Sequence, residues 1–169
     1  NAKRQPVSID VVRATACELS PIVKAMLAIH IQTGMRPAEL CDMRPKDIDR
    51  SGEVWLYRPA QHKTKHHGKP RVIPILGDAR EALIEYLNRA PDSHCFSPKE
   101  ADAWFRAKLR SERKGYGSYK PTKGTLRAGT KYSPQSYRQA IERAAKRAKV
   151  GHWVPYQLRH LNLTEVRQA

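Results

Sequence analysis

The chain has 169 residues, of which 40% are hydrophobic and 28% are charged, a composition typical of one globular domain with its own core. No apolar run reaches the roughly 18–20 residues of a membrane-spanning helix. Cys17, Cys41 and Cys95 are odd in number and far apart in the sequence, so we expect free thiols, as in a reducing cytoplasm, rather than a disulfide framework.

Positive charge is in large excess and unevenly distributed. Lys and Arg total 32 against 16 Asp and Glu, a formal net charge of +16. Residues 99–149 alone hold fifteen Lys or Arg but four Asp or Glu. Such a segment attracts polyanions, because each neutralised phosphate releases counterions, and nucleic acid is the expected partner. A membrane surface fits less well, since no long basic amphipathic stretch carries an apolar face with Trp or Phe.

Three helices are predicted in the first quarter of the chain. Ser8 is the expected N-cap of a short helix over SIDVVRATA. Ser20, followed by proline, begins a second helix that Gly34 ends as a C-cap. The predicted inner face of this second helix contains Ile22, Met26 and Ile29. Pro37 begins a third, short helix, PAELCDM, after which PKDIDRSGE is a turn that leads into a strand.

A small sheet and another helix follow. Residues 53–60 (EVWLYRPA) and 71–76 (RVIPIL) have the β-branched and aromatic content of strands. Between them lies QHKTKHHGKP, a polar and basic connection over residues 61–70. The next segment, GDAREALIEYLNRA, has the apolar spacing of an amphipathic helix. Its predicted inner stripe contains Ala82, Leu83, Tyr86 and Leu87.

The last third is predicted to be helical around one irregular segment. A helix begins at Pro98, and residues 115–132, rich in Gly, Pro, Thr and Lys, are a loop that is disordered or becomes ordered on binding. Ser133 begins a helix that runs to Gly151, and residues 155–169 are helical. The predicted inner face of the helix after Ser133 contains Tyr137, Ile141, Ala144 and Ala148. The predicted fold is therefore mainly α with a small antiparallel β-sheet (α+β), in a single domain over residues 1–169.

Three stretches carry residues suited to phosphate chemistry. They are TGMRPAELCDMRPKDID (residues 33–49), HKTKHHGKPRVIPI (62–75) and PYQLRH (155–160). One arginine beside a helix start is most often solvated or paired with a nearby carboxylate, here Glu39 for Arg36. Taken together and in this order, the three stretches resemble the catalytic domain of the tyrosine recombinases, the phage integrase family. The resemblance runs from about Val7 to the last residue.

The resemblance implies DNA cleavage by a tyrosine nucleophile, through a 3′-phosphotyrosyl intermediate, with no cofactor and no metal. It makes Arg36 and Arg159 the pair that stabilises the charged phosphorane, because planar guanidiniums match phosphate oxygens and stay protonated. Glu39 is expected to hold the guanidinium of Arg36 in place. Lys63 matches the hairpin lysine that donates a proton to the departing 5′ oxygen, with Lys65 as the alternative.

The sequence departs from the family pattern in two places, at Tyr156 and after Arg159. Tyr156 stands where the family usually has a histidine, and a phenol binds phosphate but does not shuttle protons near neutral pH. His160 matches the second histidine, as a catalytic residue or a packing one. No tyrosine follows Arg159. We therefore expect this chain to lack the nucleophile and to be inactive as given, with an amino-terminal DNA-binding domain and a carboxy-terminal segment outside it.

Residues 99–132 form a basic insertion that is longer than in compact family members. It either contacts the DNA backbone or is a solvated segment that affects only solubility. The residues expected to bind DNA are Lys65, Lys69, Arg71, Lys114, Lys120, Lys123, Arg127 and Lys131.

The expected function is site-specific recombination, the integration or excision of a phage or other mobile element. The partner is then double-stranded DNA, and the chain is cytoplasmic and associated with the nucleoid when bound. Family members act as tetramers on DNA, whereas this chain alone is expected to be a monomer. One alternative is a non-catalytic basic DNA-binding module derived from an integrase. A second is an RNA-associated protein, although the sequence holds no RNP-type aromatic motif or GXXG loop.

Overall fold

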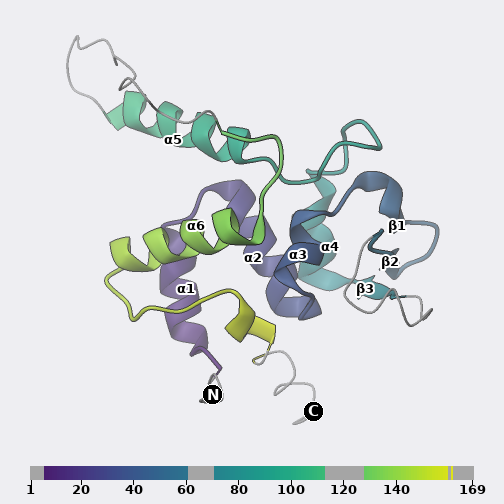
Figure 1. Cartoon of the computed structure of the whole chain (residues 1–169), viewed down its shortest axis with the longest axis horizontal. Helices are drawn as coiled ribbons and strands as arrows, with labels where there is room; N and C mark the ends of the chain where they lie inside the picture. Colours follow the sequence, from purple (N-terminus) through teal and green to yellow (C-terminus); the bar gives the residue numbers. More distant parts are fainter. Residues whose placement is uncertain (1–5, 61–70, 113–127, 160, 162–169) are drawn as a thin grey trace.

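The computed structural model describes residues 6–60, 71–112, 128–159 and 161. Its α-helices are α1 (Ile9–Cys17), α2 (Pro21–Thr33), α3 (Pro37–Cys41), α4 (Gly77–Ile84), α5 (Pro98–Glu112) and α6 (Pro134–Arg147). A small sheet lies at one end of the molecule beside α3 and α4, α1 and α6 lie at the other end, and α5 lies along the top (Figure 1). Within the described ranges, no helix is both long enough and apolar enough to cross a membrane.

The predicted helix boundaries are confirmed at several caps. The Ser8 hydroxyl accepts a hydrogen bond from the backbone N–H of Asp10, at 3.3 Å, and begins α1. Gly34 ends α2 in the left-handed conformation, with φ of 55° and ψ of 20°, and its N–H donates to the carbonyl of His30. The Ser133 hydroxyl accepts from the N–H of Ser136 and begins α6. Local side-chain chemistry thus sets where these helices begin and end.

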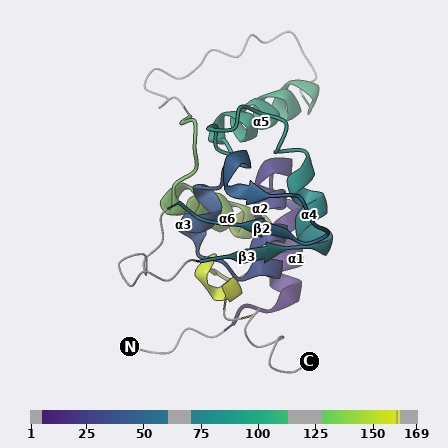
Figure 2. The ribbon, with the colours of Figure 1, turned by 90° about the vertical axis from the view of Figure 1, so that its right-hand side faces the viewer.

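The sheet is antiparallel, in the order β1 (Ile48–Asp49), β2 (Trp55–Tyr57) and β3 (Ile73–Ile75). A 3-10 turn, η1 (Pro45–Asp47), leads into it. Trp55 pairs with Ile75 and Tyr57 with Ile73, and all four side chains are buried. The residues between them, Leu56 and Pro74, turn to the other face and are more exposed. In Figure 2 the strands run across the front of the helices.

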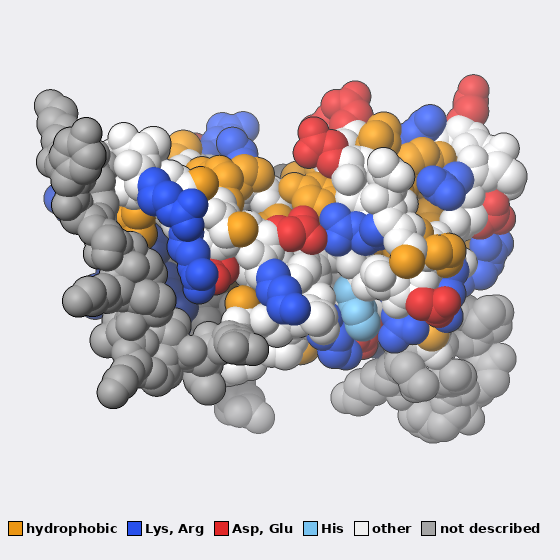
Figure 3. Space-filling model, turned by 90° about the horizontal axis from the view of Figure 1, so that it is seen from above, with side chains coloured by type: hydrophobic (Ala, Val, Ile, Leu, Met, Phe, Trp, Pro, Cys, Tyr) orange, Lys and Arg blue, Asp and Glu red, His pale blue; other side chains and the backbone are white. Residues whose placement is uncertain are grey.

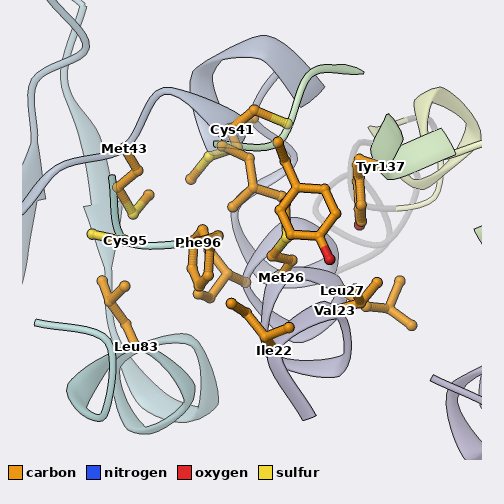
Figure 4. Close-up of a cluster of buried hydrophobic side chains, with 14 of the residues drawn as sticks. Ile22, Val23, Met26, Leu27, Cys41, Met43, Leu83, Cys95, Phe96 and Tyr137 are labelled. Atoms are coloured by element: carbon orange, nitrogen blue, oxygen red, sulfur yellow. The ribbon is translucent and has the colours of Figure 1, made fainter. Parts of the chain in front are cut away.

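The core forms where α2 meets α3, α4 and α6. Figure 4 shows Met26 of α2, Leu83 of α4 and Tyr137 of α6 around a shared apolar centre with Cys95 and Phe96. All five of these side chains are fully buried. Cys41 and Cys95 are buried free thiols and Cys17 is an exposed one, as the sequence predicted. Because α2 packs against α3, α4, α5 and β3, its position in the fold is fixed from several sides.

Three sequence predictions are wrong in detail. The helix predicted over residues 77–90 ends at Ile84, as α4. The last long helix ends at Arg147 rather than near Gly151, and Lys149 takes the left-handed conformation with φ of 55°. The N–H of Val150 then bonds the carbonyl of Ala145, so the chain turns before the glycine. Tyr132, at the end of the predicted loop, is 4% exposed and belongs to the core. Most of that loop, residues 115–127, lies outside the described residues.

Candidate functional site

The site is built on the turn between α2 and α3. Gly34 is buried and left-handed, and Met35 after it is fully buried, which fixes the direction in which the chain leaves α2. The Thr33 hydroxyl donates to the carbonyl of Ile29, at 2.7 Å, and steadies the last turn of α2. Arg36 is the N-cap of α3 in an extended conformation, and its side chain is 30% exposed. A guanidinium is thereby presented at the surface from a rigid turn.

A buried carboxylate holds Arg36. Glu39 is 2% exposed, and its Oε1 accepts from the Arg36 guanidinium at 2.8 Å while its Oε2 accepts from the Arg36 backbone N–H at 2.8 Å. Burial acts to raise the pKa of Glu39, but hydrogen bonds from Arg71 and Arg36 outweigh it and hold that pKa below its usual range. Glu39 is therefore a carboxylate, and the predicted contact with Arg36 is present.

A second arginine reaches the same carboxylate from the sheet. Arg71 lies two residues before β3, and its Nε is 2.6 Å from Oε1 of Glu39. Its terminal NH2 donates to Oε2 at 3.0 Å. Tyr57 of β2 adds a third connection, since its hydroxyl donates to the backbone carbonyl of Glu39 at 2.7 Å. The sheet and α3 are thus joined through the residue that holds Arg36.

Arg159 approaches the turn from the other end of the sequence. It lies on a helical turn over residues 156–159, where the neighbouring Leu158 is fully buried. The Arg159 guanidinium donates to the carbonyl of Gly34, at 2.9 Å. Upstream of this turn, Trp153 is buried and its indole N–H donates to the hydroxyl of Thr15 at 3.0 Å. Two arginines 123 positions apart therefore meet at one turn.

A buried histidine lies next to the turn that Arg159 contacts. His30 of α2 is fully buried, and its Nδ1 is 3.4 Å from the hydroxyl of Tyr137. Burial lowers the pKa of His30 from 6.5 to about 4, and the charge of Arg159 acts in the same direction. The backbone of Met35 and the charge of Glu39 oppose this shift. His30 is therefore neutral at physiological pH.

The structure describes two further predicted site residues, Tyr156 and Lys131. Tyr156 is 43% exposed and borders a shallow hollow with Pro37 and Arg138. Lys131 forms an exposed ion pair with Asp42 at 2.9 Å. The other predicted residues lie outside the described residues: Lys63, Lys65, Lys69, Lys114, Lys120, Lys123, Arg127 and His160. Their predicted roles stay predictions.

Three contributors to the site are not evident from the sequence. The sequence assigns Arg71 to DNA, whereas the structure engages it with Glu39, a pairing across 32 positions that no local pattern reveals. Tyr57 is predicted only as part of a strand. His30 follows Ile29 of the predicted inner face, so the spacing of buried residues on α2 is a usable signal for its burial.

Charge on the rest of the described surface is mixed. On the face seen in Figure 3, Lys and Arg side chains lie among acidic and hydrophobic ones rather than in one basic patch. In the parts of the chain that the structure describes, no three His, Cys, Asp or Glu residues are grouped to hold a metal ion.

Comparison with known proteins gives consistent matches. The sequence matches the family model described as the phage integrase family over residues 12–168. A putative integrase/recombinase of Sinorhizobium fredii, y4rF, is 37% identical over 87 residues, which cover 49% of this chain and 18% of that protein. The tyrosine recombinase XerC of a Roseiflexus species is 28% identical over 137 residues, covering 81% of this chain and 36% of that protein.

A solved structure shares the fold. The Tn1549 transposon integrase in complex with circular intermediate DNA matches with a TM-score of 0.60 and 16% identity, over 99% of this chain and 56% of that one. This likeness confirms the predicted fold of a tyrosine-recombinase catalytic domain. The chain spans about a third or less of the length of these two curated relatives.

Proposed function

Because the chain belongs to the phage integrase family, we propose that it acts in DNA cleavage and rejoining through a 3′-phosphotyrosyl intermediate, during the integration or excision of a mobile element. The observation that carries this proposal is the meeting of Arg36 and Arg159 at the turn around Gly34. Each guanidinium has five N–H donors, so the bonds to Glu39 and to Gly34 leave donors for a phosphate.

The reaction needs charge stabilisation more than it needs acid–base chemistry. A tyrosine oxygen attacks the phosphorus, a P–O bond to tyrosine forms, and the bond to the 5′ oxygen breaks. The negative charge that builds on the phosphorane oxygens is stabilised by Arg36 and Arg159. The departing 5′ oxygen takes a proton, in this proposal from Lys63. Tyr156 contributes at most a hydrogen bond to a phosphate oxygen.

Double-stranded DNA is the proposed partner. The net charge of +16 favours binding to a polyanion, and one of the structural matches is an integrase in complex with DNA. We extend this proposal to a monomer in solution that assembles with other copies on DNA, and to an association with the nucleoid. The predicted DNA contacts of residues 61–70 and 113–127 belong to the same proposal.

The proposal is tested by trapping the covalent intermediate. The protein, expressed from its complete reading frame, is incubated with a pool of nicked duplexes of randomised sequence, and products are separated on a denaturing gel. We expect a protein band carrying DNA through its 3′ end, which leaves a free 5′ hydroxyl that a kinase can label. Sequencing the attached DNA then gives the target site. The absence of any adduct, despite tight binding, would contradict the proposal.

The alternative is a DNA-binding module without catalysis, and the observation that favours it is Tyr156 in place of the usual histidine. Replacing Arg36 with alanine distinguishes the two functions. In an enzyme this change abolishes the adduct and leaves DNA affinity nearly intact. In a binding module no adduct forms in the first place, and replacing Arg36 weakens affinity as replacing any other phosphate-binding residue does.

A further inference from the structure

Glu39 faces two guanidiniums, although only one of them belongs to the predicted phosphate-binding pair. Its two carboxylate oxygens receive the side chain and backbone N–H of Arg36 and the side chain of Arg71. Arg71 is 26% exposed, against 30% for Arg36 and 2% for Glu39. Arg71 is therefore about as buried as Arg36 and, like Arg36, is paired with the carboxylate of Glu39.

The second guanidinium matters because of charge. A carboxylate paired with Arg36 alone cancels the positive charge that a phosphate needs, and the pair is then neutral. With Arg71 present, Glu39 is neutralised from the sheet side and the group of three keeps a net positive charge. Removing one partner of a buried pair leaves uncompensated charge and is costly. Without Arg71, the carboxylate therefore competes with the DNA phosphate for Arg36.

Arg71 also connects the sheet to the turn between α2 and α3, through its ion pair with Glu39. It lies just before β3, directly after residues 61–70, which include the predicted proton donor Lys63. Tyr57 of β2 fixes Glu39 from the backbone side. Contacts from both strands of this hairpin therefore set where α3, and with it Arg36, lies relative to the hairpin.

We propose that Arg71 is a positioning residue of the strand-cleavage reaction, which acts by neutralising and orienting Glu39 so that Arg36 is free to bind the scissile phosphate. The inference rests on the proposed function. It replaces the expectation that Arg71 contacts the DNA backbone. Arg71 instead affects the rate of strand cleavage through the carboxylate of Glu39.

The test measures DNA affinity and the rate of strand cleavage separately. Arg71→Gln is compared with the wild-type protein for DNA affinity and for the rate of adduct formation at saturating DNA. We expect affinity within about twofold and a rate lowered about 10- to 100-fold, as for removal of a group that orients a reacting residue. Arg71→Lys keeps the charge with fewer donors, so its rate should lie between those of the wild-type protein and Arg71→Gln. The same variant provides the test if Arg71→Gln fails to fold.

A double-mutant cycle identifies the route of the effect. In a Glu39→Gln background there is no carboxylate to neutralise, so adding Arg71→Gln should lower the rate by less than about threefold. Arg89 is the matched control, because it is 22% exposed and paired with Glu100, away from the turn. Arg89→Gln should leave the adduct rate unchanged, which excludes a general effect of removing a half-buried ion pair.

Each contrary result has a distinct meaning. A salt slope reduced by about 0.9, with an unchanged rate at saturation, would make Arg71 a phosphate-binding residue and overturn the proposal. An equal reduction of the rate in the Glu39→Gln background would show that Arg71 does not act through Glu39 and would also overturn it. No adduct from the wild-type protein would contradict the proposed function itself, and the assignment of Arg71 to the reaction with it.

Discussion

His30 is a buried base at the end of α2, beside the turn that Arg159 contacts. The neutral ring needs no counter-charge, whereas a protonated ring would face the charge of Arg159 in a fully buried position. Tyr137 of α6 and the backbone of Met35 surround it, and the charge of Glu39 favours the protonated form without prevailing. The charge state of His30 is therefore part of what keeps the turn in place.

Stability should depend on pH through His30. Its pKa is about 4 in the folded protein and 6.5 when exposed, so between these values the unfolded chain binds the additional proton. Stability is then complete above pH 6.5 and falls as the pH drops toward 4, by at most about 1.4 kcal/mol per pH unit. Urea unfolding at a series of pH values between neutral and about 5 measures this slope.

A substitution separates the contribution of His30 to the pH dependence of stability from the contributions of other groups. Burial also lowers the pKa of His94, which acts in the same direction. His30→Asn keeps a polar atom near the position of Nδ1 and removes the titration, so it should flatten the dependence on pH. The exposed His152→Asn is the control. An unchanged slope in His30→Asn would show that other residues carry the effect.

At the scale of elements, the turn between α2 and α3 is a short connection with demanding geometry. Gly34 is its left-handed residue, and the carbonyl of Gly34 also receives Arg159. A side chain at this φ is strained, because Cβ approaches the carbonyl oxygen. Gly34 therefore ends α2, sets the direction of the chain at Arg36 and accepts a hydrogen bond from Arg159.

Gly34→Ala should destabilise the fold by about 1 kcal/mol and also lower the adduct rate, because relief of the strain moves Arg36. Gly34→Asn should be milder, since asparagine tolerates the left-handed region better. Gly52→Ala is the control: Gly52 has no positive φ, and an added Cβ meets only the Val54 carbonyl, at 3.7 Å. Thermal unfolding measures stability. Equal losses of stability in Gly34→Ala and Gly52→Ala would contradict the role given to the left-handed conformation of Gly34.

The helices and the order of elements were predictable because their signals are local. Ser8, Ser133 and Gly34 cap helices through contacts within four residues. The predictions are wrong where contacts between residues distant in the sequence determine burial or the end of a helix. Tyr132 is drawn into the core by tertiary packing, and α6 ends at Arg147 because the chain after it turns back toward Thr15 through Trp153. Gly151, four positions after the end of α6, was a misleading stop signal.

The candidate site was predictable only in part: the sequence singles out three of its residues but not all of their contacts. Arg36, Glu39 and Arg159 belong to sequence patterns that the family resemblance identifies. The pairing of Arg71 with Glu39 depends on how β3 lies against α3, and the burial of His30 on how α6 covers α2. Such contacts follow from the three-dimensional arrangement and have no short sequence pattern.

At the scale of the whole molecule, much of the positive charge lies outside the described fold. Eleven of the 32 Lys and Arg residues, but one of the 16 Asp and Glu residues, lie outside the described residues. The described surface is mixed in charge, as on the face in Figure 3. Residues 61–70 and 113–127 contain six of the residues predicted to bind DNA. Together these two segments hold eight Lys or Arg and no Asp or Glu, half of the net charge of +16.

Replacing four basic residues of the insertion with glutamine should weaken DNA binding and its dependence on salt. The residues are Lys114, Lys120, Lys123 and Arg127. The slope of log affinity against log salt should fall by roughly 0.9 for each phosphate that the variant no longer neutralises, about 3 to 4 in all. The control removes the same charge from exposed positions of the described surface, namely Arg13, Lys24, Arg50 and Arg58. Equal slopes in both variants would show that only net charge matters.

The central claim is that Arg36 and Arg159 act together on one phosphate, and one measurement tests it most directly. The rate of covalent adduct formation at saturating DNA is compared for the wild-type protein, Arg36→Ala and Arg159→Ala. We predict a rate reduced about 10²- to 10³-fold or more in each variant, with DNA affinity nearly unchanged, as for removal of a transition-state donor. Adduct formation at the wild-type rate in either variant would contradict the claim.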